Sequence, residues 1–369
     1  MFRIFVCLIA ALVAVPAVAL ETKAKQAIVI EDETGAVLFE KSGYERMFPS
    51  SMTKMMTAYI TFKQLKEGKL TPETKFTVSE KAWRQQGSKM FVELGNQIPL
   101  MDLLRGVVIQ SGNDACITLA EGIAGSEEGF AGLMNEEAKV LGMKDSHFMN
   151  SDGWPDENHY TTANDLAILA RATVHNFPDY YSIYGEREFT YHGIRQHNRN
   201  LLLGGSLGVD GLKTGHTEIA GYGITVSAKN ADGRRVFVVV NGLTSEKERA
   251  EEAASLVGYA FGAFENKVIR KPGEVVATIP VWLGVQDELP VTVEKDVVVT
   301  LPKVGRDQIT FTFQGYTPVA APVQKGAPVG TLVIKAPGIS DQKVPLVAGA
   351  DIAKAGFMKR LLWNLTHFN

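Results

Sequence analysis

The chain has 369 residues, of which 45% are hydrophobic and 21% are charged, and its formal net charge is -3. A chain of this length predicts two domains, and this composition is typical of a globular protein with a full hydrophobic core. The small negative charge gives no indication of a nucleic-acid partner, because such proteins carry a basic surface.

The first residues have the pattern of a secretory signal peptide. Arg3 supplies a short positive region, the apolar run 4–15 is too short to span a bilayer, and Ala17-Val18-Ala19 fits a signal-peptidase site. The alternative is an uncleaved anchor, which the short run and the small residues disfavour. We therefore expect residues 1–19 to be a signal peptide, with an exported mature chain that begins near Leu20.

The next segments alternate between strand and helix patterns. Residues 26–41 read as a β-hairpin that turns at Glu33-Thr34-Gly35. A helix is expected from about Pro49 to Glu67, because proline favours a helix start, Gly68 ends the pattern and apolar residues recur on one face. Further helices are predicted near residues 100–109, 114–123, 127–141 and 163–175.

Strand patterns dominate from residue 209 onward. The segments 221–229 and 235–242 are rich in strand-forming residues and are joined by the turn signal Asn230-Ala231-Asp232-Gly233. A helix over 246–264 would pack back on these strands. This order of strand and helix segments along the chain predicts an α/β sandwich with a mainly antiparallel sheet and a helical insertion.

The remainder of the chain reads as a separate small domain. Short Val, Thr and Ile runs alternate with Pro and Gly, and no helical period appears before the amphipathic end. We expect a catalytic domain over residues 20–265, an all-β domain over 266–350 and a helix over 351–369.

One pair of residues has the spacing of a nucleophile and its base. Ser51 and Lys54 are three residues apart, so on a helix they share one face. Ser51 would lie in the first turn, where backbone N–H groups are free and could stabilise an oxyanion. The sequence thus predicts acyl transfer by Ser51.

Other possible nucleophiles are less well supported. Ser340 and Lys343 match the same spacing, but in the β-rich region such residues point to opposite faces of a strand. Ser50 is excluded because residue 53 is a threonine. Cys116 lies in an apolar run and is expected to be a buried structural thiol.

Two further triplets follow Ser51 in the chain. Ser111-Gly112-Asn113 is the one Ser-x-Asn in the sequence and falls between two predicted helices, and Lys213-Thr214-Gly215 begins the strand-rich region. Lys41-Ser42-Gly43 is similar but precedes the nucleophile. Each triplet alone is a weak signal, whereas their order and context together are specific. No His/Cys cluster has the spacing of metal ligands, so neither a metal nor a cofactor is expected.

These three motifs resemble those of penicillin-binding proteins and serine β-lactamases. The surrounding residues 48–57, 110–116 and 209–217 are most similar to low-molecular-mass D-alanyl-D-alanine carboxypeptidases, and the likeness extends over essentially the whole chain. Ser50 departs from the pattern, since alanine is commoner there. The resemblance implies a β-lactamase/transpeptidase-like fold, cleavage of peptidoglycan peptides that end in D-Ala-D-Ala, and covalent inhibition by β-lactam antibiotics.

The resemblance also implies roles around the nucleophile. Ser51 would attack the carbonyl of the penultimate D-alanine, with Lys54 as base. Ser111 would relay a proton to the leaving amine, and Asn113 would hold the substrate's peptide amide. The backbone N–H groups of Ser51 and His216 would form the oxyanion hole.

A second group is expected to bind the terminal carboxylate of the substrate. Lys213 would attract it and would also favour the neutral form of Lys54. Thr214 and Gly215 belong to the same motif. Arg199 and Arg249 match family positions near that end, where a planar guanidinium suits a carboxylate; a structural or solvated role is the alternative for both arginines.

Several functions share this machinery. Class A β-lactamases resemble each other in a glutamate four residues before an asparagine, whereas here Glu157 is followed by threonine at 161, so slow penicillin hydrolysis is expected. An endopeptidase that cuts cross-links uses the same motifs, although the second domain favours the carboxypeptidase. A non-catalytic wall-binding or antibiotic-sensing module is disfavoured by the intact motifs.

The predicted terminal helix is amphipathic. Its apolar side carries Phe357, Met358, Leu361, Leu362, Leu365 and Phe368. Nineteen residues with several charges suit the membrane interface better than a span. We expect the helix to hold the protein at the periplasmic face of the inner membrane, and docking on the β-domain is the alternative.

Overall fold

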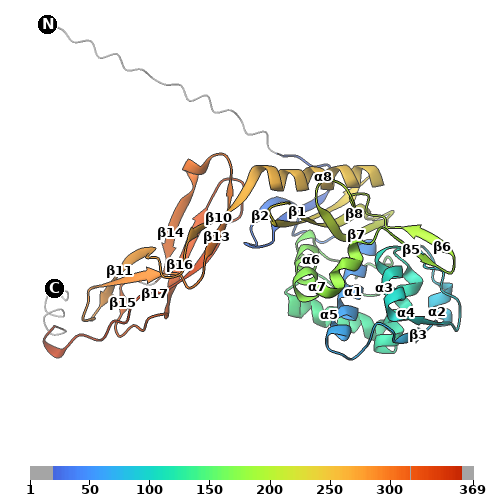
Figure 1. Cartoon of the computed structure of the whole chain (residues 1–369), viewed down its shortest axis with the longest axis horizontal. Coiled ribbons are helices and arrows are strands. Elements are labelled where there is room, and N and C mark those ends of the chain that lie inside the picture. Colours follow the sequence, from blue (N-terminus) through green and yellow to red (C-terminus); the bar gives the residue numbers. More distant parts are fainter. Residues whose placement is uncertain (1–19, 316, 360–369) are drawn as a thin grey trace, which may run out of the picture.

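The computed structural model describes residues 20–315 and 317–359. The predicted signal peptide and residues 360–369 of the predicted terminal helix lie outside these ranges. Figure 1 shows two parts, one that combines a sheet with many helices and an elongated one made of strands.

An antiparallel five-stranded sheet organises the first part. Its strand order is β2-β1-β9-β8-β7. The strands are β1 (Gln26–Glu31), β2 (Val37–Lys41), β7 (Val209–Thr217), β8 (Gly221–Lys229) and β9 (Arg235–Leu243). The sheet thus joins the two ends of this part, and everything between β2 and β7 is the helical insertion that the sequence predicts.

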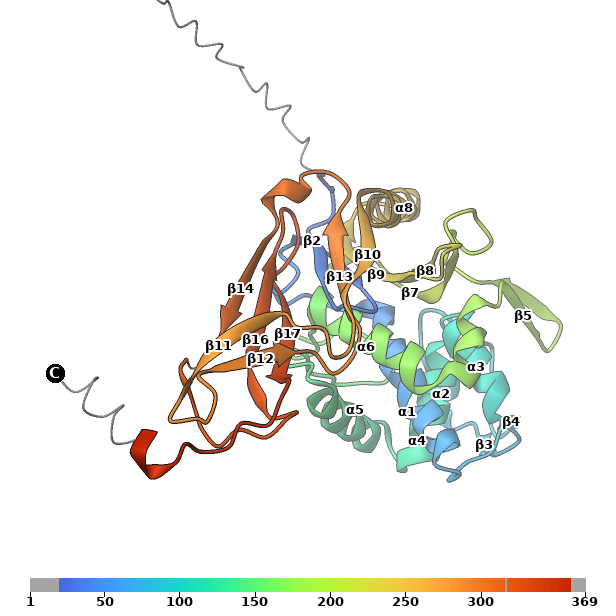
Figure 2. The same ribbon diagram turned by 60° about the vertical axis from the view of Figure 1, so that its left-hand side comes forward.

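The two faces of the sheet pack on different helices, as period-two strands require. On β9, Val238 and Val240 belong to the apolar cluster that includes α8 (Glu246–Ala263), whereas Val239 packs with α6 (Ala163–Asn176). The result is the expected sandwich of helix, sheet and helices, in which α8 covers one face and the inserted helices cover the other (Figure 2).

The inserted helices pack around one large apolar core. They are α1 (Lys54–Lys66), α2 (Glu80–Arg84), α3 (Leu100–Val108), α4 (Asn113–Ala124), α5 (Glu127–Leu141), α6 and α7 (Pro178–Tyr181), with short 3-10 turns η1 (Ser50–Thr53) and η2 (Ser182–Gly185). Side chains of Ser79, Ser126, Thr162 and Ser245 cap α2, α5, α6 and α8. Apart from the start of the one predicted from Pro49, the long predicted helices are confirmed to within about two residues.

Two small hairpins in this part are absent from the sequence prediction. They are β3 (Lys75–Thr77) with β4 (Gln97–Pro99), and β5 (Glu188–Tyr191) with β6 (Ile194–His197). Strands of three or four residues are too short to show an alternation, so their pairing depends on tertiary contacts.

The second part is all-β, as predicted. A six-stranded sheet with the order β14-β16-β17-β12-β11-β15 lies against the pair β10–β13, and their apolar faces share one core. The strands are β10 (Phe264–Arg270), β11 (Ala277–Trp282), β12 (Glu288–Thr292), β13 (Val297–Pro302), β14 (Thr310–Gln314), β15 (Val319–Ala320), β16 (Pro328–Lys335) and β17 (Gln342–Ala348), with the 3-10 turn η3 (Arg306–Gln308).

Ser340 has a structural contact between the two parts. It lies in the turn before β17, rather than on a strand as the sequence analysis assumed. Its backbone N–H donates to the carbonyl of Val37 at 3.0 Å, and its Oγ accepts from the Val37 N–H at 2.9 Å. Ser340 therefore forms hydrogen bonds with the edge strand β2. Its Ser-x-x-Lys spacing from Lys343 is a chance match to the nucleophile motif.

The predicted terminal helix begins later than expected. Ile352 and Lys354 form isolated antiparallel bridges with Val323 and Gly284, so residues 351–356 are extended along the β-rich part. Helical structure starts at Phe357. Backbone pairing with the β-domain overrides the amphipathic pattern in these first residues.

Candidate active site

Ser51 lies in a tight turn that leads into a buried helix. The single helix predicted from Pro49 is in fact a 3-10 turn, η1, followed by α1 from Lys54. Residues three apart eclipse each other in a 3-10 helix, which brings the two side chains of the motif together. The Lys54 Nζ donates a hydrogen bond to Ser51 Oγ at 3.0 Å.

The Lys54 ammonium is completely buried, with 0% exposure, and its hydrogen bonds come from three parts of the chain. Besides Ser51, its Nζ donates to Asn113 Oδ1 at 2.7 Å and to the carbonyl of Asp152 at 2.6 Å. An ammonium has three N–H donors, so all of them are used. The amine is thereby held against the serine hydroxyl.

Ser111, two residues before Asn113, has an unpaired hydroxyl. The residue is buried, adopts a left-handed backbone conformation with φ 59°, and its Oγ has no hydrogen-bond partner among the described residues. Both features are unusual for a serine and recur at functional sites. The hydroxyl is thus available to a bound molecule.

Asn113 is engaged within the protein. Its Oδ1 accepts from Lys54, and its Nδ2 donates to the carbonyl of Gln86 at 2.8 Å. The second amide hydrogen remains for a ligand. In this structure Asn113 orients Lys54, a role that the Ser-x-Asn motif did not indicate.

Lys213 is a second buried cation in the site. It lies on β7, is 2% exposed, and its Nζ donates to the Thr214 carbonyl at 3.2 Å. Burial holds the pKa of Lys213 well below its usual range, and the nearby Lys54 charge lowers it further. No carboxylate pairs with Lys213 in the part of the chain that the structure describes, so this position favours the binding of an anionic ligand.

Two glycines allow backbone segments to close tightly on the nucleophile turn. A Cβ on Gly215 would lie 2.9 Å from the Pro49 carbonyl oxygen, and a Cβ on Gly153 would collide with the Ser50 carbonyl. Gly153 also has a left-handed φ of 83°. β7 and the loop 150–154 therefore both lie directly against η1.

The remaining predicted residues gather at the same end of the sheet. His216 is exposed at the end of β7 and stacks on Tyr222, with ring centroids 3.9 Å apart. Arg249 is 2% exposed, and its Nη2 donates to the Arg199 carbonyl at 3.2 Å while its guanidinium lies over the Tyr222 ring. Arg199 itself is exposed. Arg249 therefore supports the segment that presents Arg199.

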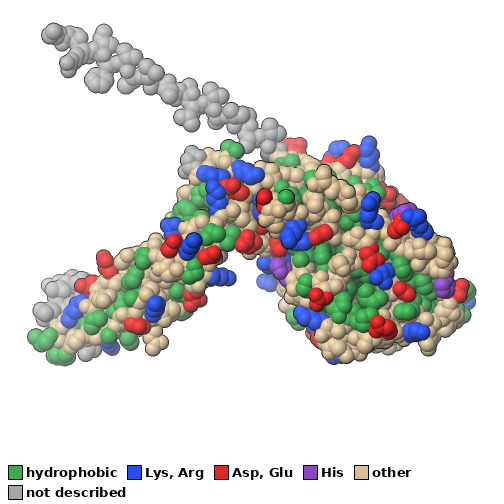
Figure 3. All heavy atoms as spheres, in the orientation of Figure 1, with side chains coloured by type: hydrophobic (Ala, Val, Ile, Leu, Met, Phe, Trp, Pro, Cys, Tyr) green, Lys and Arg blue, Asp and Glu red, His purple; other side chains and the backbone are tan. Residues whose placement is uncertain are grey.

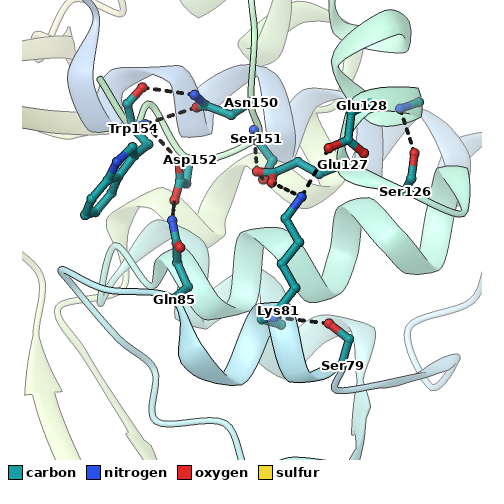
Figure 4. Close-up of polar contacts among 12 residues, drawn as sticks. Ser79, Lys81, Gln85, Ser126, Glu127, Glu128, Asn150, Ser151, Asp152 and Trp154 are labelled. Atoms are coloured by element: carbon teal, nitrogen blue, oxygen red, sulfur yellow. Dashed lines mark hydrogen bonds and ion pairs between the residues drawn. The ribbon is translucent and has the colours of Figure 1, made fainter. Parts of the chain in front are cut away.

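The loop of Asn150 to Trp154 is a component that the sequence analysis missed (Figure 4). The Asp152 carboxylate accepts from Gln85 Nε2 at 2.9 Å and from the Trp154 N–H at 2.8 Å, while its carbonyl holds Lys54. Ser151 donates to Glu127, which pairs with Lys81 at 2.9 Å. No motif marks this loop, because a backbone carbonyl carries its contribution to the site.

The other candidate chemistries find no support in this arrangement. Cys116 is fully buried and burial raises the pKa of its thiol, so it stays protonated. Within the described ranges, no group of three His, Cys, Asp or Glu residues could hold a metal ion. The site can therefore activate a serine with an amine and attract an anion with a second amine.

We predict that Gly153→Ala slows acylation of Ser51 by more than about tenfold, because the added methyl group pushes the Ser50 carbonyl and thus the nucleophile out of position. The rate of covalent labelling by an activated acyl compound measures it. Gly142→Ala is the matched control, since Gly142 has φ 79° but nothing within 4 Å of its Cβ position. That variant should lose about 1 kcal/mol of stability and keep its acylation rate; equal rates in the two variants would contradict the prediction.

Comparisons with known proteins agree with this geometry. Residues 13–244 match the D-alanyl-D-alanine carboxypeptidase family, and residues 264–354 match the C-terminal domain of penicillin-binding protein 5. The D-alanyl-D-alanine carboxypeptidase DacA of Escherichia coli (strain K12) is 37% identical over 347 residues, which cover 92% of this chain and 86% of the relative.

Solved structures extend the similarity to the whole fold. Penicillin binding protein 5 from Haemophilus influenzae is 32% identical, with a TM-score of 0.80 over 91% of this chain and 99% of that chain. The D-alanyl-D-alanine carboxypeptidase DacD from Francisella tularensis is also 32% identical, with a TM-score of 0.78 over 91% of this chain and 95% of that chain. These structures confirm the predicted sandwich followed by an all-β domain. The chain therefore belongs to the family of D-alanyl-D-alanine carboxypeptidases.

Proposed function

We propose that this protein removes the terminal D-alanine from peptidoglycan peptides ending in D-Ala-D-Ala, through an acyl-enzyme on Ser51. The observation that carries the proposal is the contact of Lys54 Nζ with Ser51 Oγ beside the unpaired, buried cation Lys213. A carboxypeptidase needs both an activated nucleophile and a site for a free carboxylate. Together with family membership, this pairing favours a carboxypeptidase over a non-catalytic wall-binding module.

Acylation begins with a proton transfer within the motif. For this step Lys54 has to be the neutral amine, which keeps two N–H donors for Asn113 and Asp152 and directs its lone pair at Ser51. Lys54 then takes the Ser51 hydroxyl proton as the Oγ bonds to the carbonyl carbon of the penultimate D-alanine. The resulting oxyanion accepts from the backbone N–H groups of Ser51 and His216. Collapse of this intermediate breaks the C–N bond, and Ser111 passes its hydroxyl proton to the departing amine of the terminal D-alanine. Protonated Lys54 gives a proton to Ser111 in turn, which leaves Lys54 neutral for deacylation.

Deacylation uses water and the same groups. A water molecule gives a proton to Lys54 and attacks the ester carbonyl, and Ser51 leaves with a proton returned from Lys54. β-Lactams would enter by the same first step, since their ring carbonyl imitates the D-alanine carbonyl. Their ester would hydrolyse slowly, because the glutamate pattern of class A β-lactamases is absent.

Location is a further part of the proposal. The apolar run and Ala17-Val18-Ala19 support export, and the sequence after residue 356 supports attachment to the periplasmic face of the inner membrane. The last described segment, drawn in red, lies at the end of the β-rich part that is away from the helices (Figures 1 and 2). Its Phe357 and Met358 are exposed. No helix in the described ranges is long and apolar enough to cross a bilayer. The β-domain would then act as a spacer between membrane and active site.

The face in view in Figure 3 carries Lys and Arg side chains interspersed with Asp and Glu. Neither sign forms a continuous patch there. Such a surface offers no electrostatic footprint for a nucleic-acid backbone on this face.

The nucleophile is tested by covalent labelling. We expect labelled penicillin to attach to Ser51, because this serine alone has a buried lysine at hydrogen-bond distance among the described residues. Mass spectrometry of the labelled peptide identifies the site, and Ser51→Ala should abolish it. Ser340→Ala is the control and should label normally; label on Ser111 or Ser340 would disprove the assignment.

The second prediction concerns the carboxylate. A peptide amidated at its terminal D-alanine should react with kcat/KM about a hundredfold lower than the acid, because a charged contact worth roughly 3 kcal/mol is lost. Release of the terminal residue is measured for both peptides. Equal rates would favour the endopeptidase, which acts on residues without a free terminal carboxylate.

The third prediction concerns attachment. A stop codon after Gly356 retains Ile352, whose backbone pairs with Val323, so the β-domain stays intact. The shortened protein should keep its activity on soluble peptide and move from the membrane pellet to the soluble fraction. A shortened protein that still pellets places the anchor elsewhere, and one that loses activity shows that the segment is part of the folded core.

A further inference from the structure

His159 is a buried histidine that contacts the nucleophile turn and takes no part in the proposed mechanism. The residue is 2% exposed, and its ring packs edge-on against Phe148 with centroids 5.6 Å apart. It lies between α5 and α6, a few residues after the loop 150–154. A polar ring buried to this degree is costly unless both of its nitrogens are paired.

The two ring nitrogens contact different segments of the chain. The backbone N–H of Met149 donates to Nδ1 at 3.3 Å, and Nε2 lies 2.9 Å from Thr53 Oγ1. Because a backbone N–H can only donate, Nδ1 must accept and carries no proton. The proton of the neutral ring is therefore on Nε2, which donates to Thr53.

Thr53 is a fully buried residue of η1, the turn that also carries Ser51, and it directly precedes Lys54. A Cβ on Gly153 would lie 2.9 Å from Thr53 Oγ1, so the loop packs closely on this hydroxyl. A hydrogen bond to Thr53 thus acts on the backbone that carries both reacting side chains.

Two other hydrogen bonds join the loop to α1. Lys54 Nζ donates to the Asp152 carbonyl at 2.6 Å, and Thr57 Oγ1 donates to the Ser151 carbonyl at 2.5 Å. Both start from α1 rather than from η1, the turn that carries the nucleophile. His159 contacts η1 itself, so it fixes this turn relative to the beginning of the loop.

This pair of hydrogen bonds requires a neutral ring. A protonated histidine has an N–H on each nitrogen, so Nδ1 would face the Met149 N–H as a second donor. Burial is the main reason that the pKa of His159 falls to about 4. The charged and titratable groups that act on the ring are Asp156, which raises this pKa, and His147 and Lys54, which lower it.

We propose that His159 is a positioning residue for acylation, which holds η1 and the loop in the register that places Lys54 against Ser51. It acts as a donor to Thr53 and as an acceptor from Met149, and it needs no contact with the substrate. The inference rests on the proposed acylation of Ser51 and adds a residue that lies outside the three motifs.

The test measures the acylation rate constant with a penicillin separately from the dissociation constant of the noncovalent complex. His159→Leu removes both hydrogen bonds and should lower the rate constant by at least about tenfold, because a small displacement of the reacting groups is costly. His159→Gln keeps an N–H donor where Nε2 lies and should recover most of the rate. The dissociation constant should change by less than about twofold in both variants.

Thr53→Val tests the same hydrogen bond from its other end. Valine has a similar shape without the hydroxyl, so this variant should also acylate about tenfold more slowly. In the His159→Leu background the partner is already absent, and adding Thr53→Val should lower the rate by less than about twofold more.

His147→Leu is the matched control, because His147 lies in the same connection between α5 and α6. Its Nδ1 lies 2.7 Å from the Asn158 carbonyl, and its ring contacts Tyr160 rather than η1. This variant should keep the acylation rate of the unmodified protein.

The pH profile gives an independent readout. The rate of the unmodified protein divided by that of His159→Gln should be constant near pH 7 and should fall as the pH drops through about 4, because glutamine cannot gain a proton. A ratio that stays constant to low pH would contradict the requirement for a neutral ring.

The other failures are also distinct. A His159→Gln rate as low as that of His159→Leu, multiplicative losses in the double variant, or an equal loss in His147→Leu would overturn the positioning role while Ser51 is still acylated. If the leucine variant does not fold, a slow Thr53→Val and a nearly normal His159→Gln still decide the question. Absence of acylation in the unmodified protein would instead disprove the proposed function.

Discussion

The buried ammonium of Lys54 is the group around which the rest of the site is arranged. A charge with no exposure to water is tolerated only if each of its donors is paired, and its acceptors come from η1, from α4 and from the loop at Asp152. Asn113 is 59 residues and Asp152 is 98 residues from Lys54 in the sequence, so the buried charge fixes the relative positions of three distant segments. The same three hydrogen bonds thus pair the donors of the buried Lys54 ammonium and hold it against Ser51.

The second cation explains why the site suits an acidic end group. Lys213 is buried without a carboxylate, although burial of an unpaired charge is costly. In the proposed function this free-energy cost is present in the free protein, and a substrate carboxylate would relieve it on binding. Binding energy would then be concentrated at the end of the peptide that distinguishes a carboxypeptidase substrate.

Close backbone packing holds these charges in place. Gly215 and Gly153 let β7 and the loop 150–154 approach η1 more closely than any side chain would allow. The same loop carries Asp152, which holds Lys54. The loop is supported from outside by the contacts from Ser151 through Glu127 to Lys81.

The sequence by itself determined the long helices, the strands after residue 209, the all-β second part and the three motifs, because periodicity and spacing are local properties. It could not predict the hairpins β3–β4 and β5–β6, whose strands are too short to show a period, or the extended start of the terminal segment, which pairs with the β-domain. Tertiary structure alone decided that Asp152 would hold Lys54 and that Arg249 would support Arg199. The physical reason is that these contacts use backbone carbonyls, which every residue has, so no residue type in the sequence marks them.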